Sequence, residues 1–141
     1  MVVISVMMST RTENNNAAHS PSSALLDDAE ALKDRTDEAA DLLSAMSNAK
    51  RLLILCNLVN GEMPVGRLAD TVGLSQSALS QHLAKLRARK LVATRRDAQT
   101  IYYSIASNSV FRILETVAHI FLTERGANES VHPDAKHARV G

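Results

Sequence analysis

Residues 64–105 read PVGRLADTVGLSQSALSQHLAKLRARKLVATRRDAQTIYYSI, and this stretch decides the fold. Its first part, residues 64–90, predicts two helices separated at Gly73, because glycine tolerates the left-handed backbone that ends a helix. Ser75 is a good N-cap for the second of these helices. The last part, residues 91–105, is rich in β-branched and aromatic residues and predicts two short strands. The stretch therefore predicts a helix-turn-helix followed by a β-hairpin wing.

The helix after Ser75 has two contrasting faces. Leu79, Leu83 and Leu86 recur at helical spacing, so we expect them to point inward. The opposite face carries small and amide side chains, which allow close approach to DNA and can hydrogen-bond to base edges. The alternative is an ordinary surface helix. The residues that we predict to read bases are Gln76, Ser77, Ser80 and Gln81.

Positive charge gathers in the same part of the chain. Residues 48–105 carry nine Lys and Arg against three acidic residues, whereas residues 1–47 carry three against eight. The net charge of +1 therefore hides a basic middle third, which favours a polyanionic partner such as DNA. The alternative for the hairpin tip is a solvated turn. The residues that we predict to contact the DNA backbone, from the helix or the wing, are Lys85, Arg87, Arg89, Arg95, Arg96 and Gln99.

Three further helices are expected around this unit. Residues 27–46 predict one helix with an acidic first turn. Residues 48–59 predict a central, largely buried helix, because apolar residues cover more than one of its faces. A last amphipathic helix is expected from Ser107 or Asn108 to about Glu124, with Gly126 ending it. The predicted fold is thus mainly α with a small β-hairpin, in the order α-α-α-α-β-β-α.

The chain has few large side chains with which to build a core. Aromatic residues make up 3% of the sequence and there is no Trp. A small domain of this kind buries little apolar surface alone, so we expect a partner subunit to complete the core. The apolar residues that we expect at a subunit contact lie on the first and last helices at Leu32, Ala39, Leu43, Ile113, Val117, Ile120 and Phe121.

The ends of the chain differ from its middle. Residues 1–26 and 126–141 show no apolar period and are expected to be disordered, flanking one domain over residues 27–125. No apolar run approaches the roughly 20 residues that span a membrane. Residues 1–8 are apolar but lack a basic start, so we expect no secretory signal. With a single cysteine and no sign of an oxidising compartment, we expect a cytoplasmic protein.

Chemical groups outside the DNA-reading unit are few. Cys56 lies on a broadly apolar helix, where it is either a small buried hydrophobe or a reactive thiol. His119 is either a metal ligand or the polar edge of the last helix. No nucleophile, base and acid share a supporting loop context, and no glycine-rich phosphate loop is present. We therefore expect no enzyme activity and no cofactor.

Three blocks carry a resemblance to a known family. LLSAMSNAKRLLIL (residues 42–55), VGRLADTVGLSQSALSQHLAKLRARKLV (residues 65–92) and TRRDAQTIYYS (residues 94–104) occur in the order and spacing of one group of regulators. On these blocks the chain resembles the ArsR/SmtB-type bacterial winged-helix regulators. Within that family it is similar to the rhizobial nodulation-gene repressors and to the biofilm and haemolysin regulators with a redox-active cysteine pair. The resemblance implies a homodimer that represses transcription from an imperfect palindromic operator.

The resemblance also implies sensor sites that this sequence does not complete. Metal-sensing members carry a Cys-Val-Cys type motif on the helix matching residues 64–72, or Asp-x-His and His-x-x-Glu sets on the last helix. Here the first is missing and the last helix offers only His119, so we expect no metal site. Thiol-sensing members carry two cysteines, of which Cys56 matches one and Leu122 stands near the other. The effector stays open, and the alternatives to a simple repressor are a thiol sensor acting through Cys56 and a protein-interaction module.

Overall fold

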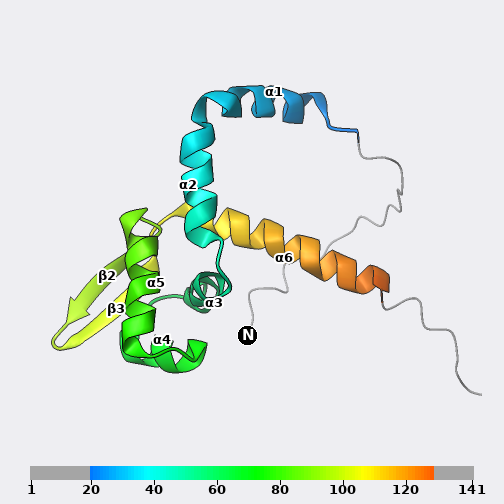
Figure 1. The fold of residues 1–141 in the computed structure, drawn as a ribbon. Helices are drawn as coiled ribbons and strands as arrows, with labels where there is room; N and C mark the ends of the chain where they lie inside the picture. Colours follow the sequence, from blue (N-terminus) through cyan, green and yellow to red (C-terminus); the bar gives the residue numbers. More distant parts are fainter. Residues whose placement is uncertain (1–19, 129–141) are drawn as a thin grey trace, which may run out of the picture. The chain divides into compact units, whose positions relative to one another are not determined.

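The computed structural model describes residues 20–128, in two compact units that meet between Thr36 and Asp37. The first unit contains helix α1 (Ser23–Leu32) and a 3₁₀ turn, η1 (Lys33–Arg35). Ser22 caps α1, since its hydroxyl accepts a hydrogen bond from the backbone N–H of Leu25. This unit is labelled α1 in Figure 1. The predicted tails outside residues 20–128 lie beyond the described residues.

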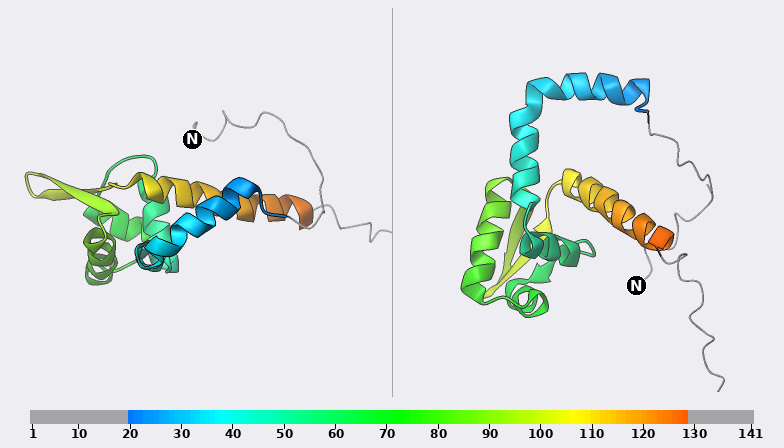
Figure 2. Two further views of the ribbon diagram at one scale, coloured as in Figure 1. Left: turned by 90° about the horizontal axis from the view of Figure 1, so that it is seen from above. Right: turned by 45° about the vertical axis from the view of Figure 1, so that its right-hand side comes forward.

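The second unit holds the other elements, except that the first residue of α2 belongs to the first unit; they are shown in Figures 1 and 2. Two helices precede β1, two lie between β1 and β2, and one long helix follows β3. The elements are α2 (Thr36–Met46), α3 (Ala49–Leu58), β1 (Met63–Pro64), α4 (Val65–Val72), α5 (Gln76–Ala88), β2 (Val92–Asp97), β3 (Thr100–Ile105) and α6 (Asn108–Asn128). Within the described residues, no helix combines the length and the apolar character needed to cross a membrane.

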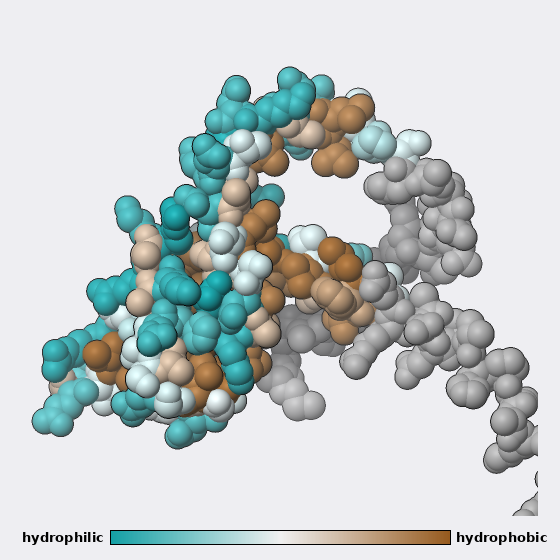
Figure 3. Space-filling view, viewed as in Figure 1, coloured by the Kyte–Doolittle hydropathy of each residue, from teal (hydrophilic) through white to brown (hydrophobic). Residues whose placement is uncertain are grey.

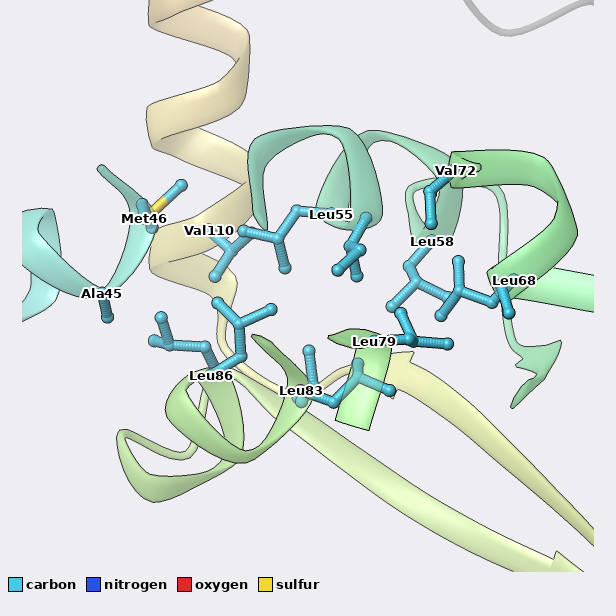
Figure 4. Close-up of a cluster of buried hydrophobic side chains, with 14 residues drawn as sticks. Ala45, Met46, Leu55, Leu58, Leu68, Val72, Leu79, Leu83, Leu86 and Val110 are labelled. Carbon is cyan, nitrogen blue, oxygen red and sulfur yellow. The ribbon is translucent and has the colours of Figure 1, made fainter. Parts of the chain in front are cut away.

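The core lies where α3, α4, α5 and the start of α6 meet. Leu79, Leu83 and Leu86 of α5 point toward Leu55 of α3 and Val110 of α6 in Figure 4. All five side chains are fully buried. Burying a leucine of this kind contributes about 1.5–3 kcal/mol, so the three leucines fix which face of α5 remains outside.

The sheet is antiparallel, with strand order β1-β3-β2. The register pairs Val92 with Ile105 at one end and Asp97 with Thr100 at the other. Only Met63 and Pro64 form β1, so the end of the hairpin nearest its tip has two strands. In Figure 1 and in the left view of Figure 2 the hairpin extends from the helices on the side opposite α6. The structure thus confirms the predicted winged helix-turn-helix.

The N-terminal helix differs from the prediction. One helix was predicted over residues 27–46, but α1 begins at Ser23 and the 3₁₀ turn η1 separates it from α2. The Thr36 hydroxyl donates to the carbonyl of Lys33 at 3.3 Å, which is one of the local bonds by which Thr competes with helical pairing. The intervening residues Lys33–Arg35 are all charged and offer no apolar side chain to hold a continuous helix against a core.

Two further details differ. Helix α6 was predicted to end near Glu124 but continues to Asn128, because one glycine in a helix costs only about 1 kcal/mol. Helix α3 was predicted to be largely buried, but only one side of it is. Ile54, Leu55 and Leu58 are in the core, whereas Leu53 and Val59 are exposed.

Candidate nucleic-acid interface

The turn before α5 aims this helix outward. Gly73 ends α4 with φ +65°, a left-handed conformation, and its N–H bonds back to the carbonyls of Ala69 and Asp70. Ser75 then caps α5, since its hydroxyl accepts the N–H of Ala78 at 3.2 Å. Both local signals follow the sequence prediction. Because both ends of the turn are fixed, the start of α5 is a defined surface rather than a frayed end.

The four predicted base-reading residues lie on the exposed side of α5. Gln76, Ser77, Ser80 and Gln81 are all exposed, opposite the three buried leucines. The hydroxyls of Ser75 and Ser77 lie 3.2 Å apart and share a hydrogen bond. The structure therefore brings together hydroxyl and amide groups on one turn-and-a-half of helix, a set that can donate to and accept from base edges.

The basic residues of α5 fall into two groups. Lys85 and Arg87 are exposed, and neither forms an ion pair with a side chain of residues 20–123. Arg89, at the C-cap of α5, donates to the carboxylate of Asp41 in α2 at 2.6 Å. Lys85 and Arg87 thus remain available for phosphates, whereas Arg89 joins the helix to α2.

The wing also has one engaged and one unengaged arginine. Arg95 binds Glu62 through two hydrogen bonds, of 3.0 and 2.6 Å. Arg96 is exposed and forms no ion pair in the described part of the chain; its Nε donates to the carbonyl of Ala98 at 3.2 Å. Gln99 is exposed beside it at the tip. Figure 3 shows mostly hydrophilic side chains over the hairpin.

The tip turns without a glycine. Ala98 takes φ +52°, in the left-handed region that alanine rarely adopts. The bond from Arg96 to its carbonyl is one contact that holds this conformation. The sequence has no Gly in this turn, and in the structure Ala98 adopts the left-handed conformation that a glycine would usually take.

Cys56 is exposed in the single subunit, so of the two alternatives the structure does not support the buried small hydrophobe. It lies on the outer side of α3, between the exposed Leu53 and Val59. His119 is exposed on α6. Among residues 20–128, no three His, Cys, Asp or Glu side chains are grouped closely enough to hold a metal ion.

Helix α6 carries one apolar stripe that is covered over half its length. Val110 is fully buried, and Ile113 and Leu114 pack against the same core. Farther along the stripe Ile120 is exposed and Phe121 is 64% exposed. Figure 3 shows apolar side chains gathered along this helix. The second half of the stripe is an apolar surface that the described residues leave open.

The other predicted dimer contacts divide in the same way. Ile113, placed at the dimer contact by the sequence, packs partly against its own core. Val117 and Ala39 are half-buried, whereas Leu43 on α2 is 56% exposed. Leu32, in the first unit, is also exposed. Leu43, Ile120 and Phe121 are therefore the exposed predicted contacts of the second unit.

Three residues important to the site were not singled out from the sequence. Arg51 is buried and bonds the end of α2, Glu62 engages Arg95, and Asp41 engages Arg89. Asp41 and Arg89 are 48 positions apart, and Glu62 and Arg95 are 33 apart. No local sequence pattern predicts such pairs. Arg51 is different, because it lies three residues after Asn48, the N-cap of α3, and a basic residue at that position of an apolar helix could have been singled out.

His82 lies at the edge of the buried face of α5. Its Nδ1 is buried, and no hydrogen-bond partner lies near it. Burial lowers the pKa of His82, and the positive charges of Arg51, Lys85 and Lys50 lower it further. His82 is thus neutral in the fold under conditions where an unfolded chain already takes up a proton.

This difference predicts that acid weakens the fold around neutral pH. The unfolded chain binds a proton at His82 near the ordinary pKa of about 6.5, whereas the folded chain does so only at lower pH. The stability that neutral His82 allows above its ordinary pKa is therefore lost as the pH falls below that pKa. We expect the free energy of unfolding in urea to fall between about pH 7.5 and pH 5.5, and His82→Gln to reduce this fall.

Glu62 provides an internal comparison. The hydrogen bond from Arg95 lowers the pKa of Glu62. The contribution of Glu62 to folding stability is therefore lost only when the pH falls below the ordinary range of a carboxyl group. Glu62→Gln should therefore leave the slope near neutral pH unchanged. An equal slope in wild type and His82→Gln would show that His82 is not the group responsible.

Comparisons with known proteins agree with this geometry. Residues 48–94 match the family described as "Bacterial regulatory protein, arsR family". Nodulation protein NolR of Rhizobium meliloti is 63% identical over 91 residues, covering 64% of this chain and 75% of NolR. The transcriptional activator HlyU of Vibrio cholerae is 48% identical over 84 residues, covering 60% of this chain and 78% of HlyU.

A solved structure extends the match to three dimensions. The transcriptional repressor BigR from Xylella fastidiosa is 36% identical, with a TM-score of 0.63, and the match covers 65% of this chain and 94% of that one. The relatives are thus matched over most of their length. The chain belongs to the arsR family of bacterial regulatory proteins, and its winged helix-turn-helix is a DNA-binding unit of transcriptional regulation.

Proposed function

We propose that the protein is a homodimeric repressor that reads an imperfect palindromic operator in double-stranded DNA, and that it acts in the cytoplasm. The observation that carries the proposal is the exposed face of α5. Four hydroxyl and amide side chains lie there, opposite three leucines that fix the helix to the core. A helix presented in this way fits the major groove, and its N-terminal residues meet base edges.

Each subunit supplies one reading helix and one wing. Gln76, Ser77, Ser80 and Gln81 read bases, while Lys85, Arg87 and Arg96 bind phosphates. The dimer places its two α5 helices in successive major grooves, about one helical turn or 34 Å apart. The exposed stripe of α6 around Phe121, with Leu43 on α2, forms the subunit contact.

Repression is the proposed sign of regulation. The names of the relatives point both ways, since HlyU is called an activator and BigR a repressor. A dimer that spans two major grooves excludes other proteins from that stretch of DNA, which favours repression when the operator overlaps a promoter. Transcription in vitro from such a promoter, with and without the protein, tests whether the protein represses or activates. More transcript in the presence of the protein would mean that it is an activator.

Binding to DNA from upstream of the protein's own gene tests the central claim. Fluorescence anisotropy compares that DNA with a scrambled duplex of equal composition at near-physiological salt. Specific affinities usually exceed nonspecific ones by roughly a thousandfold or more. Weak, equal binding to this and to every other promoter fragment offered would favour a protein-interaction module with the same fold.

Gln81→Ala is expected to weaken cognate binding more than nonspecific binding. Gln81 is exposed on the reading face, and an amide that pairs with a base edge contributes about 1–3 kcal/mol of discrimination. The cognate affinity should therefore fall by about 5- to 150-fold, while the scrambled duplex binds almost as before. Asn60→Ala, which removes an exposed amide outside the proposed interface, is the matched control. An equal loss on both duplexes would remove Gln81 from the base-reading set.

A thiol-responsive repressor is the second candidate, because Cys56 is exposed. The chain has no second cysteine, so a disulfide at Cys56 requires a thiol from another molecule. Cognate binding is measured before and after labelling of the native protein with a maleimide. Loss of binding that Cys56→Ser escapes would support sensing. Full labelling with unchanged binding would assign Cys56 no role in the response.

A further inference from the structure

The guanidinium of Arg95 is held on several sides. Its Nε and Nη2 donate to the two carboxylate oxygens of Glu62, at 3.0 and 2.6 Å. Its Cζ lies 4.5 Å from the centroid of the Tyr102 ring, and Nη1 lies 3.7 Å from a carboxylate oxygen of Asp97. Two-point pairing and stacking on a ring are geometries that arginine adopts and lysine cannot reproduce. The pairing lowers the pKa of Glu62 and raises the pKa of Arg95.

This cluster lies where the sheet narrows. Tyr102 of β3 pairs with Pro64 of β1 on one side and with Arg95 of β2 on the other. Glu62 immediately precedes β1, and its carboxylate pairs with Arg95 of β2 although β3 lies between β1 and β2 in the sheet. Beyond this row β1 has ended, and the strands nearest the tip pair only with each other. Arg95 thus connects the base of the free hairpin to the chain before β1.

The free part of the hairpin needs such a connection. A two-stranded hairpin is only marginally stable by itself. The wing tip carries Arg96 and Gln99, which are exposed and meet DNA only if the hairpin keeps one direction. Arg95 itself is poorly placed for a phosphate, because Glu62 occupies two of its donors, Tyr102 stacks on its plane and two carboxylates surround its charge.

We propose that Arg95 is a positioning residue, and that Glu62 sets through it the direction in which the wing presents Arg96 to the DNA backbone. This inference rests on the proposed DNA-reading function. It takes Arg95 out of the set of phosphate contacts that the sequence predicted and gives Glu62, an acidic residue, a supporting role in binding a polyanion.

The sign of one substitution tests this directly. Glu62→Gln removes a negative charge, so electrostatic attraction alone would strengthen DNA binding. If Arg95 positions the wing, operator binding weakens instead, by about 3- to 10-fold. The plot of log affinity against log salt becomes less steep, by up to about 0.9 in the magnitude of its slope, as the Arg96 phosphate contact is lost. Arg95→Lys keeps the charge but loses the two-point pairing, and should weaken binding to a similar extent.

Hydrogen exchange in the DNA-free protein gives a second, independent readout. Backbone amides of residues 95–102 should exchange faster in Glu62→Gln and Arg95→Lys than in wild type. Arg87→Ala is the matched control, since it removes a proposed phosphate contact from α5 and should lower the affinity and the steepness of the salt dependence without changing exchange in the hairpin. This measurement needs no DNA, so it tests the Glu62–Arg95 connection even if wild type fails to select its operator and the proposed function fails.

Two results would overturn the proposal. Tighter binding with a steeper salt slope in Glu62→Gln would mean that Glu62 competes with phosphates for Arg95, which would then be a DNA contact. Unchanged exchange in both variants would mean that the hairpin keeps its direction without this pair.

Discussion

Phe121→Asp is expected to yield a folded monomer whose affinity for a palindromic operator is reduced by about 10²–10⁴-fold. Phe121 is 64% exposed on α6, so in a single subunit the new carboxylate is solvated and the core is untouched. In the proposed dimer the same carboxylate is buried in an apolar contact, which costs several kcal/mol. Without the dimer, the two reading helices bind independently, and the gain from linking two half-sites is lost.

Mass measurement by light scattering after size exclusion, combined with anisotropy titrations, tests this expectation. Binding to a single half-site should change little, because α5 and the wing are intact. His119→Asp is the matched control: it adds an acid to the same helix, but its exposed position lies opposite the stripe of Val110, Val117 and Phe121. A Phe121→Asp protein that remains dimeric would show that the subunits meet elsewhere.

Local signals in the sequence predicted most of the second unit. Ser75 caps α5 and Gly73 ends α4 in the left-handed conformation, as predicted, because each of these effects depends on neighbouring residues only. The leucine spacing of α5 likewise identified its buried face. Where a decision depended on competition between weak preferences, as at Lys33–Arg35, the prediction of one continuous helix was wrong.

The site was predictable in position but not in the pairing of its charges. The exposed face of α5 follows from helical periodicity once its leucines are buried. Which arginines remain available does not, because Arg89 and Arg95 are engaged by acids distant in the sequence. The exposure of Cys56 stayed open for a related reason. An apolar helix predicts burial, but which of its faces are covered depends on how it packs against the other helices, and its periodicity alone does not give that packing.

Arg51→Met is expected to lower the free energy of unfolding by about 2–3 kcal/mol. Arg51 is only 8% exposed, although it carries a permanent charge. Its Nε donates to the carbonyl of Ala45, and its Nη2 donates to that of Ser44 at 3.2 Å. Both carbonyls belong to the last turn of α2, where regular helical partners run out and the helix dipole is negative; the Ser44 carbonyl also accepts the N–H of Ser47 at 3.3 Å. Methionine fills similar space but supplies neither the donors nor the charge.

Urea unfolding followed by circular dichroism, at one fixed protein concentration because a dimer's stability depends on it, measures the loss. Arg51→Lys keeps the charge but cannot donate in a fork, so we expect it to recover part of the stability. Arg67→Met makes the same exchange at an exposed position of α4 and should change the free energy by less than about 0.5 kcal/mol. Equal small effects at both positions would mean that water satisfies the two α2 carbonyls as well as Arg51 does. A large loss of unfolding free energy in the Arg51 variant alone would identify Arg51 as the residue that fixes the junction of α2 and α3. Because α5 packs against α3, this junction also supports the position of α5.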